Sequence, residues 1–412
     1  MRSTINGNAA DYACYPSVRQ FGSHFGVEHL QRCIRQSNAE PVPCDLAVHV
    51  QGATAQDDEC DHHVALLIKE AATMGALFDA DRCVEQVAID ENVTRTANEA
   101  CLRKLMTGLH EAFHFSKSAA VQFAVDSRHV GHAEIAAMVS LGATRIGVGI
   151  HECDGQGLAA SAVQTVEGAW RTIGYCVKHP GVALDLDLFI GCTGQTHASF
   201  STTLELAIAN RPARIALPSC WCSAEQTLGE SWRELAIERL VFEGYVYLGL
   251  GQLVASEDAL AHARSANKLR RTLLGFTAGA HCDVIGLGPG AISRIGDSLS
   301  QNATELSSWT RAVHASELAV TRGRLLDYDD IVRGAVIDEL MCRGSVEIPT
   351  VERRFALDFP TYFADALARL AALEDHGIVA RDPTRIAATS RGRGQLRMIA
   401  ACFDRYHDTN TR

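Results

Sequence analysis

The chain has 412 residues, of which 47% are hydrophobic, so it is long enough to bury a large core and an appended domain. Its formal net charge of -11 disfavours general binding to nucleic acid or to anionic membranes, because both attract basic surfaces. Apolar runs stay short of the ~18 residues that a membrane helix requires, and residues 1–8 contain no hydrophobic signal core. These features predict a cytoplasmic protein with no membrane or nucleic-acid partner.

Short apolar runs alternate with longer helical periods over residues 44–300, after an expected N-terminal arm over residues 1–43. The apolar runs predict strands at 46–50, 86–89, 121–125, 145–150, 182–190, 214–217 and 246–248. Amphipathic stretches such as 97–113 and 132–141 predict helices between several of them. Alternation of strand and helix is typical of an α/β protein with a parallel sheet, either wound into a barrel or open.

Residues 301–412 have a different pattern, which predicts a second domain. Helical periods cover 329–342 and 359–375, a hairpin pattern covers 377–379 and 386–389, and an apolar helix is expected over 395–403. The order helix, helix, hairpin, helix is that of a small winged-helix-like domain. No Pro/Gly-rich linker marks where this domain begins.

Several motifs along the chain resemble one known family. They are Tyr12-Ala13-Cys14-Tyr15-Pro16, the run from Gly286 to Ser293, Gln301-Asn302-Ala303-Thr304-Glu305-Leu306, and the C-terminal pair Thr389–Arg393 and Cys402–Tyr406. All of them resemble segments of the oxygen-independent coproporphyrinogen III oxidase family, within the radical SAM enzymes. The resemblance implies a partial (β/α) TIM-like barrel over 44–300, with an N-terminal arm and a winged-helix-like C-terminal domain.

The resemblance also implies a 4Fe-4S cluster that binds S-adenosylmethionine (SAM). In the family, a Cys-x3-Cys-x2-Cys loop after the first strand holds this cluster, and the three positions correspond here to Ala53, Asp57 and Cys60. Iron-sulfur clusters are held by cysteine thiolates, and neither a methyl group nor a lone carboxylate replaces the missing sulfurs. Cys60 is therefore the remaining cluster ligand, and we predict that the cluster and its SAM chemistry have been lost.

Other SAM-site positions of the family have also changed. The glycine-rich loop after the second strand corresponds to residues 90–94, which read Asp-Glu-Asn-Val-Thr and would crowd the amino-acid end of SAM. Polar residues of the family pocket correspond here to Ala47, Ala124, His151, Val163, Gly251 and Gln252. Only Asp187 and Ile292 still match positions that line the pocket in the family, so they are the predicted residual SAM-pocket residues.

Competing motifs indicate other kinds of site. His110-Glu111-Ala112-Phe113-His114 fits the zinc-binding His-Glu-x-x-His pattern, but it falls at the end of an amphipathic helix, where we expect a surface helix terminus. Cys60, His62 and His63, with Asp57, offer thiol, imidazole and carboxylate ligands in one loop, and Cys220 and Cys222 form a second thiol pair. Whether either group binds a metal stays open. The glycines of 286–290 are interpreted as a tight barrel turn, and Arg391-Gly392-Arg393-Gly394 as a solvated turn.

Two functions follow from these observations. The first is a relative of the oxidases that has lost the cluster and acts as a porphyrin or haem binding, regulatory or partner protein, the last by pairing with an active paralogue. In this function His151, Cys153, Cys220 and Cys222 are candidate axial ligands for haem. The second is the reaction that the family implies, the oxidative decarboxylation of coproporphyrinogen III to protoporphyrinogen IX in haem biosynthesis. The sequence alone leaves open whether the chain is an enzyme.

Overall fold

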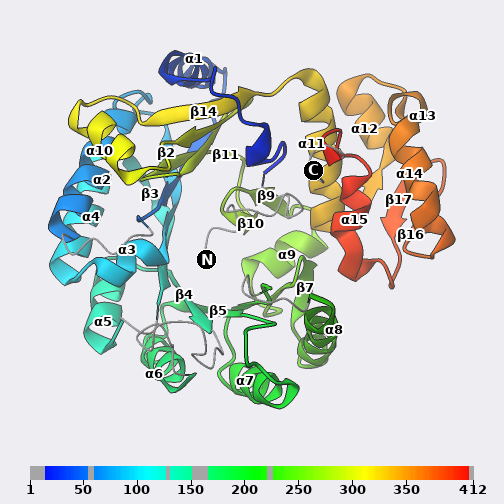
Figure 1. The fold of residues 1–412 in the computed structure, drawn as a ribbon, viewed down its shortest axis with the longest axis horizontal. Helices are drawn as coiled ribbons and strands as arrows, with labels where there is room; N and C mark the ends of the chain where they lie inside the picture. Colours follow the sequence, from blue (N-terminus) through cyan, green and yellow to red (C-terminus); the bar gives the residue numbers. More distant parts are fainter. Residues whose placement is uncertain (1–13, 54–59, 127–129, 151–165, 220–225, 408–412) are drawn as a thin grey trace. The chain divides into compact units, whose positions relative to one another are not determined.

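A computed structural model of the chain describes residues 14–53, 60–126, 130–150, 166–219 and 226–407. These residues divide into two compact units, which are described separately below. Unit 1 comprises residues 21–236 and 280–325, and unit 2 comprises residues 14–20, 237–279 and 326–407. Figure 1 shows the chain coloured along its sequence.

The core of unit 1 is a mixed sheet with the strand order β14-β13-β12-β11-β1-β2-β3-β4-β5-β6. Strands β11 and β1 to β6 run parallel to one another, whereas β12, β13 and β14 are added to β11 by successive antiparallel pairings. The strands are β1 (Asp45–Val50), β2 (Cys83–Ile89), β3 (His114–Val125), β4 (Arg145–Ile150), β5 (Ala183–Leu188), β6 (Arg214–Ala216), β11 (Cys282–Leu287), β12 (Ile292–Ile295), β13 (Ser298–Asn302) and β14 (Val320–Leu325).

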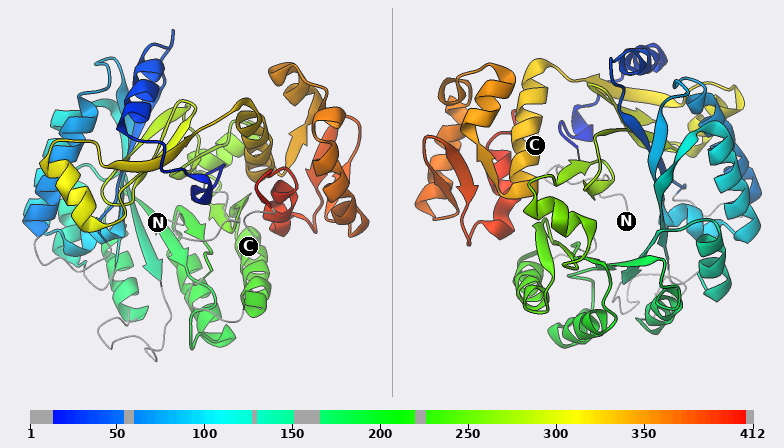
Figure 2. Two further views of the ribbon diagram at one scale, coloured as in Figure 1. Left: turned by 45° about the horizontal axis from the view of Figure 1, so that its top comes forward. Right: turned by 180° about the vertical axis from the view of Figure 1, so that it is seen from behind.

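Helices cover the outer face of this sheet (Figures 1 and 2). They are α1 (Val27–Asn38), α2 (Cys60–Gly75), α4 (Glu99–Ala112), α5 (His132–Ser140), α6 (Val166–Cys176), α7 (His197–Ala209) and α10 (Leu306–His314), and α8 (Gln226–Phe242) begins in this unit. The short helix α3 (Glu91–Thr96) instead lies at the carboxyl ends of β1, β2 and β3. In α4 the buried residues Leu102, Leu105 and Leu109 recur at helical spacing, so one side of the helix packs on its neighbours.

Unit 2 contains the β7 (Val246–Gly249) and β8 (Gln252–Val254) pair, the β9 (Arg270–Thr272) and β10 (Gly275–Thr277) pair, and a three-stranded antiparallel sheet in the order β15-β17-β16. That sheet is formed by β15 (Ser345–Glu347), β16 (Val379–Arg381) and β17 (Arg385–Ala388). The helices are η1 (Val18–Gln20), α9 (Ala259–Ser265), α11 (Tyr328–Arg343), α12 (Ile348–Phe355), α13 (Phe359–Tyr362), α14 (Ala364–Asp375), η3 (Arg393–Gln395) and α15 (Leu396–Ala401).

A shared core holds the last elements of unit 2 together. Val336, Leu340, Phe359, Leu370 and Phe403 are fully buried within it. The C-terminal segment is also tied to α11 by charge, because the guanidinium of Arg405 lies 2.6 to 3.0 Å from the carboxylates of three aspartates at the start of that helix. These are Asp327, Asp329 and Asp330.

The predicted elements compare closely with the observed ones in several places. The strand predicted at 145–150 is β4, the helix predicted at 329–342 lies within α11, and the hairpin is β16 and β17. The strand predicted at 246–248 is β7, but it pairs with β8 in antiparallel fashion, whereas the alternation of strand and helix predicted parallel pairing. The helix expected over 359–375 is divided between α13 and α14.

The two compact units do not coincide with the three expected domains, and the boundaries at 43/44 and 300/301 stay predictions. Residues 298–325 belong to unit 1 because β13 and β14 extend its sheet by antiparallel pairing beyond β12. Residues 21–43 also belong to unit 1, where α1 packs against β12, β13 and β14 and buries Leu30 and Ile34. A short apolar run does not show in the sequence which sheet its strand will join.

None of the helices in the described ranges is long and apolar enough to cross a membrane.

A buried carboxylate connects three elements of unit 1. Glu70 of α2 accepts hydrogen bonds from the backbone N of Gly288 at 2.7 Å, from Asn302 Nδ2 at 2.8 Å and from Trp309 Nε1 at 3.1 Å. Burial raises the pKa of Glu70 to about 7, and the three donors offset only part of that cost. The network fixes the turn after β11 to α2 and α10.

We expect this carboxyl to make stability depend on pH. The folded pKa lies above the value of 4.5 for an unperturbed glutamate, so between pH 4.5 and 7 the folded state binds more protons than the unfolded state. Its contribution therefore favours folding below pH 4.5 and is lost as the pH rises to 7. Urea unfolding of the wild type and of Glu70→Gln at several pH values measures this. The difference between the two proteins should change with pH between 4.5 and 7, and a constant difference would contradict the assignment.

Candidate functional site on the inner face of the barrel

The strand register of unit 1 places polar side chains on the face of the sheet opposite the helices. Neighbouring residues across paired strands share a face, and side chains alternate between faces along each strand. His49 of β1, Ala88 of β2, Gln122 of β3 and Arg145 of β4 are paired in turn and form one row across the sheet. The alternate residues are apolar and buried, as with Val48, Val87, Phe123 and Ile146. The sheet is thus apolar toward the helices and polar on its inner face.

Charged residues of β4, β5 and β6 lie together on this inner face. Arg145 forms an ion pair with Asp185, and Asp185 lies beside Arg214 in the register of β5 and β6. Burial raises the pKa of the Asp185 carboxyl, and Arg145 and Arg214 oppose that shift. The imidazole of His49 is buried, which lowers its pKa to about 4, so it is neutral at physiological pH.

The two predicted pocket residues, Asp187 and Ile292, lie on the same inner face. Asp187 of β5 pairs with Gly149 of β4 and Ala216 of β6. Arg294 of β12 pairs with Val284 of β11, and Gly286 of β11 pairs with His49 of β1. Residues two apart in a strand share a face, so Ile292 lies on the same face as His49. The strands β11, β1, β2, β3 and β4 separate Asp187 from Ile292 in the sheet order. Nothing in the described contacts tests a role for them in SAM binding, so that role stays a prediction.

The structure describes two of the three positions that correspond to the cluster ligands. Ala53 follows β1, Cys60 is the first residue of α2, and Asp57 lies outside the described residues. The thiol of Cys60 lies within hydrogen-bonding reach of the thiol of Cys101 on α4. The pKa of the Cys60 thiol is raised to about 12, mainly by burial and next by the neighbouring thiol of Cys101. The environment thus favours a protonated thiol packed between two helices.

These residues do not fit a 4Fe-4S cluster. Such a cluster is held by several cysteine thiolates that converge on it. Among the described residues at the three positions, there is one thiol, and its thiol neighbour Cys101 is 1% exposed within the α4 packing.

The segment that corresponds to the glycine-rich SAM loop forms a short helix. Asp90 is the N-cap of α3, and its carboxylate accepts a hydrogen bond from the backbone N of Asn92 at 2.5 Å. Thr94 Oγ1 donates to the carbonyl of Ala124 at the end of β3, at 2.7 Å. Asp90 and Thr94 are both buried. Asp90, at a glycine position of the family loop, and Thr94, at its last position, therefore both find hydrogen-bond partners within the protein.

The zinc-like motif at 110–114 is split between two elements. α4 ends at Ala112, Phe113 has extended backbone, and His114 begins β3. The His110 ring instead lies tilted against the ring of Phe115, with ring centroids 4.0 Å apart. The two histidines are not one helical turn apart on a single face, which the zinc motif requires. This confirms the interpretation of the segment as a helix terminus at the surface.

The side chains of Cys60, Asp61, His62 and His63 point to different neighbours. Asp61 forms an ion pair with Lys104 at 2.7 Å, His62 lies near His314, and His63 packs against Trp309. They do not converge on one point within the described structure. His151, Cys153, Val163, Cys220 and Cys222 lie outside the described residues, so the haem-ligand and thiol-pair hypotheses stay predictions.

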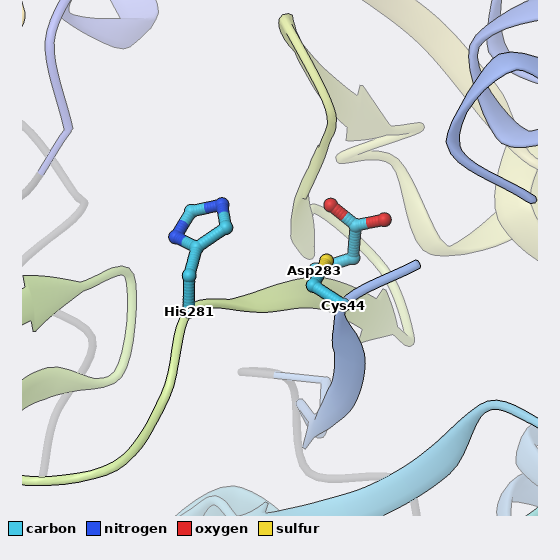
Figure 3. A group of neighbouring side chains, drawn as sticks. All are labelled: Cys44, His281 and Asp283. Carbon is cyan, nitrogen blue, oxygen red and sulfur yellow. The ribbon is translucent and has the colours of Figure 1, made fainter. Parts of the chain in front are cut away.

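A separate Cys-His-Asp group lies at the opposite, N-terminal ends of β1 and β11 (Figure 3). One potential ligand atom from each of Cys44, His281 and Asp283 lies within 4.8 Å of the others. However, the guanidinium of Arg82 already lies there, 2.8 Å from the Asp283 carboxylate and 3.6 Å from the Cys44 sulfur. A buried cation in this position repels a metal ion, so the group is better explained as a structural ion pair.

The charged residues of the inner face were not predicted as a site, although the sequence contains a signal for them. Residues 183–188 read Ala-Leu-Asp-Leu-Asp-Leu, an alternation of polar and apolar side chains that indicates a strand with one polar face. We interpreted the whole run 182–190 as apolar and so missed Asp185. Arg145 and Arg214 stand at the start of their strands, where the sequence does not show that they face Asp185.

Comparison with known proteins identifies the family. The HemN C-terminal domain matches residues 326–393. The oxygen-independent coproporphyrinogen III oxidase of Pseudomonas aeruginosa is 27% identical over 432 alignment positions, which cover 96% of this chain and 93% of that protein. The protein of the same name from Thermostichus vulcanus is 30% identical over 312 positions, which cover 72% of this chain and 96% of that protein.

The solved structure of coproporphyrinogen III oxidase from Escherichia coli, described as a radical SAM enzyme, has a TM-score of 0.87 and 25% identity. It covers 96% of this chain, and this chain covers 97% of it. The likeness confirms the fold class that we predicted, with a central parallel sheet and a C-terminal helical domain. The full-length match, the strand order of unit 1 and the C-terminal domain together show that the chain belongs to the oxygen-independent coproporphyrinogen III oxidase family.

Proposed function

We propose that the chain binds a tetrapyrrole of the coproporphyrinogen class on the inner face of the barrel and does not generate a radical there. The observation that carries this proposal is the set of donors at the cluster positions, where a methyl group at Ala53 and one packed thiol at Cys60 stand. The family relationship supplies the ligand class. Haem is included among the tetrapyrrole ligands in this proposal.

The inner face offers groups that suit such a ligand. Propionate side chains are carboxylates, and guanidinium groups recognise carboxylates with paired hydrogen bonds. Arg145 and Arg214 stand on neighbouring positions of this face with Asp185 between them. A propionate that approaches Arg214 would share it with Asp185, whose burial already disfavours its charged form.

A second candidate function is the oxidative decarboxylation of coproporphyrinogen III. The names of the relatives support this function more directly than the first one, because both relatives above are called oxygen-independent coproporphyrinogen III oxidases and match over most of their length. The donor residues support the first function. The two differ in whether the chain holds an iron-sulfur cluster.

Anaerobic reconstitution with iron and sulfide distinguishes the two functions. We expect wild type and Cys60→Ser to retain the same low iron content after desalting, with no 5'-deoxyadenosine released from SAM. If the wild type holds a full 4Fe-4S complement that Cys60→Ser lacks, and cleaves SAM, the second function is correct and the first is not.

Ligand binding is measured on the same protein with coproporphyrin III, the stable oxidised form of the ligand class. Fluorescence titration should show saturable binding that Arg214→Gln weakens about tenfold, the loss expected for one charge-assisted hydrogen-bonded contact. Arg103→Gln is the matched control, because that side chain is exposed on α4, on the outer layer. Absence of saturable binding to both coproporphyrin III and haem would remove the first function.

A further inference from the structure

Four arginines line one small cavity within unit 2. Arg264 comes from α9, Arg343 from the end of α11, Arg385 from β17 and Arg393 from η3. The cavity has a volume of about 100 Å³, and none of its lining residues is acidic. Gly249 and Gly344 also line the cavity, and both have positive φ. Because glycine has no side chain, neither residue fills the space between the arginines. The cavity is therefore small and strongly basic.

Two of these arginines are compensated by carboxylates. Arg385 Nε lies 3.0 Å from Glu347, and Arg343 lies 3.7 Å from Glu339. These two guanidinium groups also donate to Ser345 Oγ at 3.0 Å and to the Asn267 carbonyl at 2.9 Å, respectively. Their charges and part of their donors are thus already used by unit 2.

The other two arginines have no carboxylate partner within the described part of the chain. Arg264 donates to the carbonyl of Leu248 at 2.8 Å, which satisfies one donor and leaves the charge uncompensated. No hydrogen bond or ion pair joins the Arg393 side chain to another described residue. Burial lowers the pKa of Arg264, and the like charge of Arg393 lowers it further. An anion between these two groups would offset the cost of burying the Arg264 charge and compensate its repulsion with Arg393.

We propose that this cavity binds a phosphate group, held chiefly by Arg264 and Arg393. The excess of two positive charges matches a phosphate, which carries a charge of about -1.5 to -2 near pH 7. Arginine forks suit its oxygens, because they donate paired hydrogen bonds to tetrahedral oxyanions. The volume of about 100 Å³ has room for such a group and for few waters beside it, and it is too small for a tetrapyrrole. All lining residues of this cavity belong to unit 2, and the proposal does not depend on the function proposed for the residues of unit 1.

The phosphate belongs either to the free inorganic ion or to a monoester of a larger molecule. Isothermal titration of the full chain in a phosphate-free buffer of constant ionic strength uses three probes: inorganic phosphate, glycerol 3-phosphate and acetate. We expect saturable binding of at least one phosphate probe, and the tighter of the two identifies the source. Tighter binding of acetate than of either phosphate probe would overturn the assignment to phosphate.

Matched variants locate the site. Arg393→Gln and Arg264→Gln should each weaken phosphate binding about tenfold or more, which is the change expected for loss of one charge-assisted contact. Arg391→Gln removes the same charge two residues away, from a side chain that does not line the cavity and donates to the His376 carbonyl, and it should leave binding within twofold. Arg393 is exposed, so its variant remains informative if Arg264→Gln fails to fold. Equal weakening by all three variants, or no saturable binding by wild type, would overturn the proposal.

Discussion

Replacing Asp283 by asparagine is expected to lower the free energy of unfolding by about 3–5 kcal/mol, the range for removing one partner of a buried ion pair. Asp283 and Arg82 are each 1% exposed in their side chains, and their charged atoms lie 2.8 Å apart. The Asp283 carboxylate also accepts from Ser37 Oγ at 2.5 Å and from the backbone N of Gly296 at 2.8 Å. The variant leaves a buried guanidinium without its counter-charge, and urea unfolding measures the loss.

The control for this prediction is a surface pair with the same separation. Glu99 and Arg103 of α4 also lie 2.8 Å apart, but their side chains are more than half exposed. Glu99→Gln should therefore cost less than about 1 kcal/mol, because water and salt screen an exposed pair. In addition, an Arg82→Met and Asp283→Leu double variant should lose less than the sum of its single variants, since neither then leaves a lone buried charge.

The same variant tests whether Cys44, His281 and Asp283 form a metal site instead. A bound metal stabilises the folded state as its concentration rises. If zinc raises the melting temperature of wild type and not of Asp283→Asn, and the variant costs under 1 kcal/mol without zinc, the three residues are metal ligands and the ion-pair explanation is wrong.

Gly288→Ala is expected to destabilise the protein by about 2–5 kcal/mol, the combined range for left-handed backbone strain and for overpacking. Gly288 has φ of +104°, and a Cβ atom there would stand 2.0 Å from the carbonyl oxygen of Gln51, which is backbone and has little freedom to move. The peptide groups of Gly288 also bond to Glu70 and Asn302. The substitution therefore displaces the end of β1 from the turn after β11.

Gly142→Ala separates the two contributions. Gly142 has φ of +89°, and a Cβ atom there meets no heavy atom within 4 Å. The Gly142→Ala substitution should therefore lower the free energy of unfolding by only about 1–2 kcal/mol, the contribution of left-handed backbone strain alone. Thermal and urea unfolding of both variants measure the difference. Equal losses in the two proteins would show that the contact with Gln51 relaxes easily and that the turn is not held as described.

The sequence alone was enough to predict the family and most of the elements. Strong periodic segments such as 145–150 and 329–342 appear as β4 and α11, because alternation and helical spacing are local properties of the chain. The prediction that the cluster has been lost also came from the sequence, because the residues at the three positions that the resemblance assigns to the cluster can be read directly as Ala53, Asp57 and Cys60.

Tertiary structure decided what no local pattern contains. Only the strand register brings Arg145 and Arg214 beside Asp185, residues about 30 to 40 positions apart in the chain. The thiol of Cys60 meets Cys101 because α2 packs on α4, and Arg264 meets Arg393 because separate segments fold into unit 2. Local propensity acts over a few residues, whereas burial, pairing and charge compensation depend on which distant segments meet. For that reason the sequence was sufficient to predict the scaffold, while the charged inner face and the arginine cavity emerged only from the fold.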